Sequence, residues 1–246
     1  MELVRTEKLA LNFGGVVVAD NIDFSLHEGE RLAVIGANGA GKTTFINIVT
    51  GFLRPKSGRI FFAGEEVTGK TPRSIVRLGL GRSFQLPQLF LEHTVRQCLE
   101  LAAVGRGGSL SFFTPLANAV DTKEVDQTLE VIGLSSRQSE LASSLGEGER
   151  KLLDVAMALV LRPKLLIMDE PTSGVASEEK HGIMETLMRA LDERKVTSWF
   201  VEHDVEVVTR HATRVAAWIA GKIAADGEPT KVFADPEVRR QVLGMH

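Results

Sequence analysis

A glycine-rich segment of nine residues, 36–44 (GANGAGKTT), constrains this chain more than any other feature. It fits the pattern G-x-x-x-x-G-K-[ST] and lies between an apolar run that ends at Ile35 and a predicted helix. Glycines let a backbone curve closely around a polyphosphate, on which amide groups and the helix N-terminus converge. Lys42 adds a positive charge, and Thr43 offers a hydroxyl to a magnesium ion. A glycine-rich turn that merely contains a lysine is the alternative, and the flanking strand and helix disfavour it.

The residues on either side of this loop predict the start of an α/β fold. Alternation of apolar and polar residues predicts strands within 16–35, with a turn at 27–30. Residues 45–50 predict a helix that Gly51 closes. Strand, loop and helix in this order form a βα unit.

Two further apolar runs predict buried strands. Residues 165–168 (LLIM) are bounded by a proline and an acidic pair, as is typical of a central parallel strand, and residues 198–201 (SWFV) repeat the pattern. Residues 83–158 instead predict a mostly helical insertion with a flexible break at 105–111 (GRGGSLS). We find no internal repeat and no linker that would separate a second independent domain.

Composition excludes several classes of protein. The 246 residues are enough for one large domain, and a charge balance of 29 − 32 = −3 excludes a broadly basic surface for nucleic acid. A single cysteine, Cys98, cannot form an internal disulfide and fits a reducing compartment. The start, MELVRTEK, lacks the apolar core of a secretory signal, and the longest apolar run has seven residues, 155–161. We therefore expect a soluble chain, or one held at a membrane by a partner.

An acidic pair follows the predicted strand at 165–168. Ligands bind beyond the carboxyl ends of strands in open α/β sheets, which places Asp169 and Glu170 at such an end. We expect Asp169 to orient the metal and Glu170 to polarise a water that attacks the γ-phosphate. A solvated acidic turn is the alternative when the pair is taken alone. His203 ends another predicted strand, although a lone histidine is more often structural.

Five motifs occur in one order and spacing along the chain. They are GANGAGKTT, Gln85 within RSFQLPQLF, LGEGER at 145–150, LLIMDEPTSG, and His203 within VEHD. This set resembles the ATP-binding cassette ATPase family and covers nearly the whole chain. The FGG at 13–15, the GRSFQ stretch and the tail AGKIAADGEPTKVFADPEVRRQVLG look like the ATPase subunits of branched-chain amino acid importers.

The resemblance implies the fold class and its organisation. We expect an α/β P-loop NTPase (RecA-like) core with a mostly parallel sheet, an antiparallel N-terminal β subdomain and a helical insertion. The single ATPase domain would span 1–246, with 1–85 and 161–246 as the core and 86–160 as the helical subdomain that carries the signature motif.

The resemblance also implies roles for individual residues, with ATP and Mg²⁺ as cofactors. Phe13 would stack on adenine with Val18 as apolar support, although a packed core aromatic is the alternative for Phe13. Gln85 would contact the metal and relay the nucleotide state, and His203 would contact the γ-phosphate. Residues implied to hold nucleotide are Phe13, Val18, Asn38, Gly39, Ala40, Gly41, Lys42, Thr43, Thr44, Gln85, Gly146, Gly148 and Glu149. Those implied to hold the metal are Thr43, Gln85 and Asp169, and the catalytic set is Lys42, Glu170 and His203.

The partners follow from the same resemblance. Such ATPases work as head-to-tail dimers beneath two transmembrane permease subunits, with ATP between the phosphate loop of one chain and the signature helix of the other. The second ATPase subunit would be identical or different, and a periplasmic solute-binding protein would act indirectly. The expected location is the cytoplasmic face of the inner membrane. The insertion would dock a permease helix near Gln85, where Leu86, Leu89 and Phe90 either form the groove or belong to the core.

This chain departs from the family pattern at two places. The signature usually reads LSGGQ, and the preferred alignment gives LGEGE, so that Gly146 replaces the serine and Glu149 the glutamine. A second register through Ser144 restores a serine but requires two inserted residues. After the acidic pair, Val175-Ala176 stands where the family commonly has Leu-Asp or Leu-Asn.

Three other functions remain open on the sequence alone. An exporter is possible because the cassette carries little record of direction. A nucleic-acid or ribosome-associated relative would usually carry a long coiled-coil insertion or a second cassette, and this sequence shows neither. A regulator that binds nucleotide without hydrolysis is disfavoured, since Lys42, Asp169, Glu170 and His203 are all present.

Overall fold

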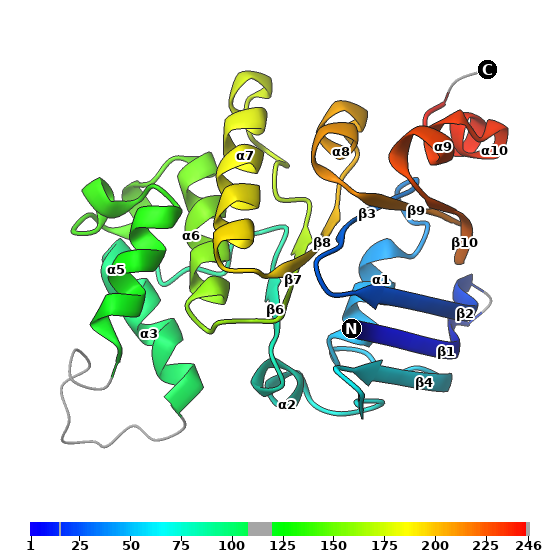
Figure 1. Ribbon diagram of the computed structural model, residues 1–246, viewed down its shortest axis with the longest axis horizontal. Helices are drawn as coiled ribbons and strands as arrows, with labels where there is room; N and C mark the ends of the chain where they lie inside the picture. The colour runs from blue at the N-terminus through cyan, green and yellow to red at the C-terminus, as the bar shows by residue number, and fades with distance from the viewer. Residues whose placement is uncertain (15, 108–119, 245–246) are drawn as a thin grey trace. The chain divides into compact units, whose positions relative to one another are not determined.

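The computed structural model describes residues 1–14, 16–107 and 120–244, apart from the side chains of Phe13, Val16 and Arg106. The chain divides into two compact units (Figure 1). The first comprises Met1–Leu80 and Thr197–His246, and the second comprises Gly81–Val196. The division of the core from a helical subdomain at 86 and 160 stays a prediction.

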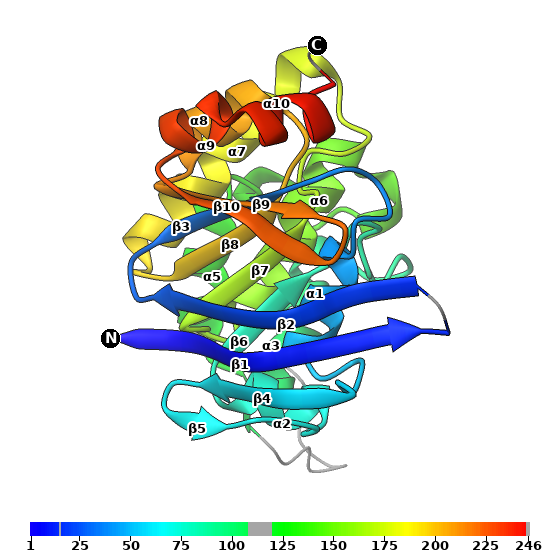
Figure 2. The ribbon, with the colours of Figure 1, turned by 90° about the vertical axis from the view of Figure 1, so that its right-hand side faces the viewer.

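An antiparallel sheet occupies the N-terminal part of the first unit, as expected for the β subdomain (Figure 2). Its strands, in spatial order, are β2 (Val16–His27), β1 (Glu2–Phe13), β4 (Ser57–Phe62) and β5 (Glu65–Glu66). In β2 the alternating residues Ile22, Phe24 and Leu26 are buried, as predicted. The pairing of β1 with β2 is interrupted by register shifts, and Lys8 and Asn21 have positive φ. These bulges break the alternation that would have revealed β1 in the sequence.

A second, mostly parallel group of strands completes the first unit. The spatial order is β10 (Lys222–Gly227), β9 (Arg214–Ile219), β3 (Arg31–Ile35) and β8 (Thr197–Val201). β3 pairs in parallel with both β8 and β9, whereas β10 is antiparallel to β9. The mixed α/β class and the two predicted strands β3 and β8 are confirmed.

The helices of the first unit are short. They are α1 (Lys42–Val49), α2 (Pro72–Arg77), α8 (Val205–His211), α9 (Pro229–Ala234) and α10 (Pro236–Gln241). Helix α1 begins at Lys42, three residues before the predicted start at Phe45. The left-handed Gly41 ends the loop, so the polar residues 42–44 already form the first turn, although the two threonines have weak helix propensity. The predicted stop is confirmed, because Gly51 follows the helix with a φ of 78°.

Four aromatic side chains form the centre of the first unit. Phe45 of α1 stacks on Trp218 of β9 with ring centroids 4.6 Å apart, and it also contacts Trp199 of β8 at 5.3 Å. Phe24 of β2 lies 5.6 Å from Phe45. This cluster joins the first helix after the glycine-rich loop to both sheets of the unit.

The second unit is mostly helical. Its elements are β6 (Leu80–Ser83), α3 (Val95–Gly107), α5 (Thr122–Val131), the 3-10 turns η1 (Ser135–Arg137) and η2 (Ala142–Ser144), α6 (Glu147–Leu159), β7 (Leu165–Asp169) and α7 (Ser177–Glu193). Helix α6 packs against α3 and α7 (Figure 1). β7 is buried throughout, as predicted, and pairs with β6, which the sequence did not reveal. The predicted break at 105–111 is wrong at its start, because α3 continues to Gly107, and 108–111 lie outside the described residues.

Candidate functional site

The glycine-rich loop of the first unit leads from β3 directly into the N-terminus of α1. Lys42 is only 7% exposed, and its Nζ donates to the carbonyl oxygens of Gly36 at 2.6 Å and Ala37 at 3.0 Å. Gly41 caps α1 without a side-chain hydrogen bond, so the first amides of the helix are not capped by its own N-cap residue. The N-terminus of a helix attracts an anion, and the ammonium of Lys42, the first residue of this helix, adds a positive charge. Thr43 is exposed and Thr44 is half-buried.

Two glycines let this loop approach β9 closely. A Cβ at Gly36 would lie 2.3 Å from the carbonyl oxygen of Trp218. A Cβ at Gly41 would lie 2.4 Å from the carbonyl oxygen of Val18 and 3.1 Å from Nε1 of Trp218. The close contact of Trp218 with the loop was missed by the sequence analysis, because only the strand order places residue 218 there.

A substitution at Gly41 tests this packing. Gly41→Ala combines a φ of 106° with the 2.4 Å approach to Val18, so something in the loop must shift. We expect a loss of about 1–3 kcal/mol in the free energy of unfolding and weaker nucleotide binding. Thermal unfolding and equilibrium ATP binding measure both effects.

Gly64→Ala is the matched control for that substitution. Gly64 has a φ of 83° but nothing within 4 Å of the position of a Cβ, so it reports backbone strain alone. Equal effects of the two alanines on stability and on binding would contradict the close packing of the loop.

The two residues expected at the adenine lie on the antiparallel sheet of the first unit. Val18 of β2 is buried, and its carbonyl oxygen faces Gly41. Phe13 is the last residue of β1, and its side chain is outside the described residues. His203 lies in the same unit, exposed, between β8 and α8. Asp204 caps α8 by accepting from the backbone N–H groups of Glu206 at 3.0 Å and Val207 at 3.3 Å, which holds the segment around His203.

The acidic pair lies at the end of β7 in the second unit. Asp169 is buried, and its carboxylate pairs with the guanidinium of Arg82 on β6 at 3.6 Å. Burial lowers the pKa of Arg82, and the charge of Asp169 opposes this effect. Glu170 follows with a φ of 51°, an uncommon backbone conformation for a residue other than glycine.

The structure brings together two of the predicted residues of the second unit. Nε2 of Gln85 donates to Oε2 of Glu170 at 2.7 Å. The carboxylate of Glu170 is therefore oriented by an amide, while the carbonyl end of Gln85 remains the part of that side chain suited to a metal. Gln85 is exposed, and Glu170 is half-buried. A carboxylate held in this way beside a buried Asp169 suits general-base chemistry on a water.

The signature segment forms the first turn of α6. Gly146 is the N-cap, and its backbone N–H donates to Oε2 of Glu149 at 3.1 Å. The same carboxylate pairs with Arg137 at 3.3 Å. A Cβ at Gly148 would lie 2.7 Å from Cδ1 of Ile183 on α7, so this glycine lets two helices approach each other. Ser144 lies in η2, where its hydroxyl donates to the carbonyl of Leu141 at 2.8 Å. Gly146 is thus the residue that directly precedes α6, and Ser144 lies two residues before it.

Each of the three residues predicted to hold the metal carries an oxygen atom, Thr43 on the first unit and the other two on the second. A hydroxyl from Thr43, an amide oxygen from Gln85 and a carboxylate from Asp169 are the hard oxygen ligands that this ion prefers. Among the residues that the structure describes, no group of three His, Cys, Asp or Glu side chains could hold a metal alone. Mg²⁺ normally binds through one or two protein ligands together with substrate phosphates.

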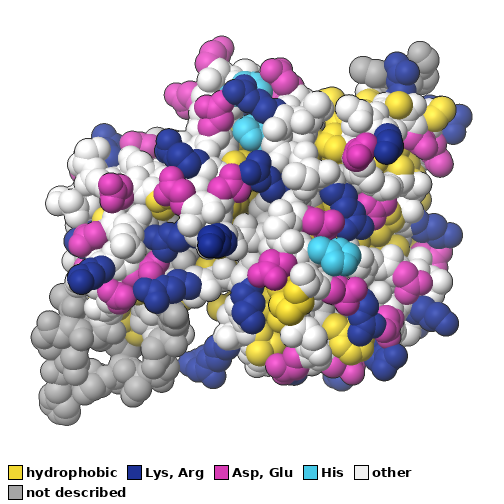
Figure 3. Space-filling view, viewed as in Figure 1, with side chains coloured by type: hydrophobic (Ala, Val, Ile, Leu, Met, Phe, Trp, Pro, Cys, Tyr) yellow, Lys and Arg dark blue, Asp and Glu magenta, His cyan; other side chains and the backbone are white. Residues whose placement is uncertain are grey.

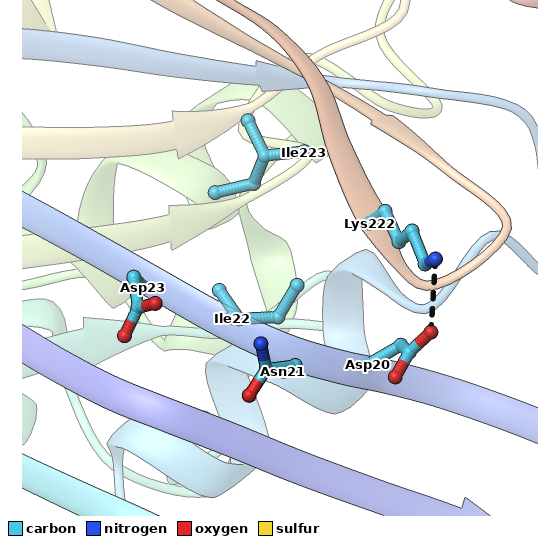
Figure 4. A pocket seen from close by; sticks show the side chains of 6 residues that line it. All are labelled: Asp20, Asn21, Ile22, Asp23, Lys222 and Ile223. Carbon is cyan, nitrogen blue, oxygen red and sulfur yellow. Dashed lines mark ion pairs between the residues drawn. The ribbon is translucent and has the colours of Figure 1, made fainter.

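A hollow on the surface of the first unit is lined by none of the residues predicted to bind nucleotide or metal. It has a volume of about 460 Å³ and is lined by Asp20, Asn21, Ile22, Asp23, Lys222 and Ile223, and Asp20 pairs there with Lys222 at 3.0 Å (Figure 4). Its charged groups lie on β2 and β10. On the face drawn in Figure 3, acidic and basic side chains are interspersed.

Comparison with known proteins agrees with the motifs. The family model described as ABC transporter matches residues 19–173. A probable branched-chain amino acid transport ATP-binding protein of Archaeoglobus fulgidus is 33% identical, over 99% of this chain and 96% of that protein. The high-affinity branched-chain amino acid transport ATP-binding protein of Escherichia coli K12 is 31% identical, over 98% of each chain.

A solved structure resembles the whole chain. The ADP conformation of an ATP-binding cassette of an ABC transporter has a TM-score of 0.82 and 31% identity, covering 99% of each chain. The fold that the motifs implied, a P-loop NTPase of the cassette type, is therefore confirmed.

Proposed function

This chain belongs to the ABC transporter family and is an ATPase, and from that premise we propose that it powers a membrane importer for branched-chain amino acids or related small polar or organic solutes. The cargo is supported by the names of relatives that match almost the whole chain. The observation that carries the hydrolysis step of this proposal is the hydrogen bond from the amide of Gln85 to the carboxylate of Glu170 at the end of β7. It gives the chain an oriented base beside a predicted metal ligand.

Each residue of the catalytic set would have a separate task. Lys42 would neutralise the β- and γ-phosphates with an ammonium that the loop carbonyls already hold. Glu170 would accept the proton of the attacking water, which leaves the oxygen free to attack phosphorus in line with the leaving ADP. His203 would contact the γ-phosphate. Thr43, Gln85 and Asp169 would hold Mg²⁺, which supplies neutralisation of phosphate charge when it binds with ATP.

We further infer that two such subunits, identical or different, dimerise head to tail around ATP. Phe13 and Val18 would support the adenine, and residues 38–44 would hold the phosphates. Gly146, Gly148 and Glu149 would contact the nucleotide of the partner chain. In a heterodimer the two sites would differ, because the altered signature of this chain serves the partner's nucleotide.

Restoring the signature serine at position 146 tests which of the two alignments of the signature motif is correct. Gly146→Ser adds a hydroxyl donor to the γ-phosphate, a charge-assisted bond of about 1.5–3 kcal/mol. We expect ATP turnover at the partner's site of the assembled dimer to rise by about tenfold or more. Steady-state hydrolysis of the dimer measures it.

Ser144→Ala provides the matched comparison. If Ser144 were the signature serine, its loss would lower turnover by a similar factor and Gly146→Ser would have little effect. That pattern would favour the second register.

The membrane partner would dock on exposed apolar residues near Gln85. Leu86 is 75% exposed, and Phe90, Leu91 and Leu141 are about half exposed, whereas Leu89 is half-buried. Exposed apolar groups on one unit suit a protein partner. Among the described helices, none combines the length and the apolar composition that crossing a membrane requires. We propose a peripheral location on the cytoplasmic face of the membrane, beneath permease subunits. A periplasmic binding protein would deliver the solute to those permease subunits.

Transport in vesicles tests the function. The chain is co-purified with its permease and second ATPase subunit, reconstituted, and given ATP inside and labelled leucine with the binding protein outside. We expect ATP-dependent uptake that stops in the Glu170→Gln variant. Movement out of the vesicles would favour an exporter, and ATP hydrolysis stimulated by nucleic acid or ribosomes without a permease would favour a non-transport role.

A further inference from the structure

A buried lysine outside the predicted site joins three of its segments. Lys151, on α6 of the second unit, is only 3% exposed. Its Nζ donates to the carbonyl oxygen of Gln85, to that of Glu170 at 3.3 Å and to the hydroxyl of Ser173 at 3.3 Å. A buried ammonium requires such acceptors, because leaving it without them would be costly. Lys151 therefore contacts the main chain of both residues of the Gln85–Glu170 hydrogen bond.

A buried aspartate lies one turn further along the same face of α6. Asp154 accepts from the backbone N–H of Phe84 at 2.9 Å through Oδ2 and from that of Gln88 at 3.0 Å through Oδ1. Burial raises the pKa of Asp154, and the two N–H groups and Lys151 oppose that rise. Together, Lys151 and Asp154 attach α6 to the backbone on both sides of the Gln85 side chain.

The placement of these charges argues for orientation rather than for stability. Well-packed apolar residues at buried positions are often at least as stabilising as a buried charged pair. Hydrogen bonds, unlike apolar contacts, fix the position and orientation of the groups that they join. Lys151 donates three and Asp154 accepts two, and together they fix the segment 84–88 and the turn after β7. A ring of contacts results: Lys151 holds the backbones of Gln85 and Glu170, and the Gln85 side chain closes the ring on the Glu170 carboxylate.

We propose that Lys151 and Asp154 are positioning residues that hold Gln85 against Glu170 and tie both to the helix that begins with the signature segment. This proposal rests on the proposed function. A displacement of the start of α6 when the partner's nucleotide binds would thus move the main chain that carries the general base and its orienting amide. Neither residue touches the nucleotide in this account.

The experiment compares three variants of the full chain. Lys151→Met keeps the length of the side chain and removes all three donors, whereas Lys151→Arg keeps charge and donors with a different geometry. Lys164→Met makes the same change at an exposed lysine that precedes β7. For each, kcat and KM for Mg-ATP hydrolysis are measured, together with the melting temperature and amide hydrogen exchange of residues 84–88 and 170–173 in the nucleotide-free chain.

The expected result is specific to Lys151→Met. Its kcat falls by about tenfold or more, a barrier increase of about 1.4 kcal/mol or more, while KM stays within about threefold. Exchange at 84–88 and 170–173 accelerates by about tenfold without a matching change in the rest of the second unit. Lys151→Arg recovers at least part of the lost kcat, and Lys164→Met behaves as the wild type.

Two results would overturn the proposal. One is a kcat for Lys151→Met within twofold of the wild type with unchanged exchange. The other is accelerated exchange over the whole second unit with an equal loss in Lys151→Arg, which marks Lys151 as a general structural residue. A wild-type chain that neither binds nor hydrolyses Mg-ATP instead overturns the proposed function, and this proposal with it, so the two failures are told apart.

Discussion

Replacing Glu170 with glutamine is expected to lower the rate of ATP hydrolysis by about 10²–10⁴-fold, the contribution typical of a general base. The amide has nearly the same shape and keeps a carbonyl oxygen that can accept the hydrogen bond from Gln85, now 2.7 Å from the carboxylate. The turn at Glu170 and the burial of Asp169 are therefore preserved. ATP affinity should stay within about threefold, and the ATP-bound dimer should persist because its nucleotide is not consumed.

Three measurements check this expectation. Single-turnover hydrolysis gives the rate, equilibrium dialysis gives the affinity, and light scattering with Mg-ATP gives the fraction of dimer. Glu178→Gln is the matched control, because Glu178 is an exposed acid in the first turn of α7. Hydrolysis by Glu170→Gln within threefold of the wild type would exclude Glu170 as the base. In a heterodimer, unequal losses from this variant and from its equivalent in the partner would support asymmetric sites.

Replacing Lys42 with methionine is expected to weaken ATP binding by about 100-fold, which corresponds to about 2.7 kcal/mol. The ammonium is held by the carbonyls of Gly36 and Ala37, so its position is set before nucleotide arrives. Methionine keeps the apolar stem of the buried side chain but removes the charge that would meet the phosphates. Charge-assisted contacts of this kind contribute about 1.5–3 kcal/mol each.

Calorimetric titration with Mg-ATP measures the change for Lys42→Met, and thermal unfolding reports whether the loop stays folded. Lys231→Met is the control, since Lys231 is exposed on α9 and its ion pair with Glu228 at 2.9 Å contributes little. We expect wild-type affinity for Lys231→Met. An unchanged affinity in Lys42→Met would show that the glycine-rich loop does not bind the triphosphate.

Local patterns predicted several elements well. The strands β3, β7 and β8 were recognisable because short apolar runs bounded by turn residues are typical of buried strands. The end of α1 was recognisable because Gly51 takes a left-handed conformation there. β1 and β6 were not recognisable, because bulges interrupt the alternation of β1 and because β6 (LGRS) carries little apolar character.

The start of α1 illustrates a different limit. The sequence pattern placed its start at Phe45, whereas in the structure the helix begins at Lys42, directly after the left-handed Gly41. An apolar pattern does not reveal polar residues in a first turn, whereas the conformation of the residue before that turn decides where the helix begins. The same residue is then constrained by its neighbours, since Val18 and Trp218 leave no room for a Cβ.

The sequence by itself determined the family, the chemistry of the loop and the identity of the acidic pair, because these depend on residue types at short, fixed spacings. Only the tertiary structure decided that Gln85 orients Glu170, that Trp218 lies against Gly41, and that Lys151 and Asp154 hold the segment 84–88. These contacts join residues 66 to 177 positions apart. Hydrogen bonds of a buried charge depend on which backbone atoms folding brings within about 3 Å of it, and no local pattern encodes that distance.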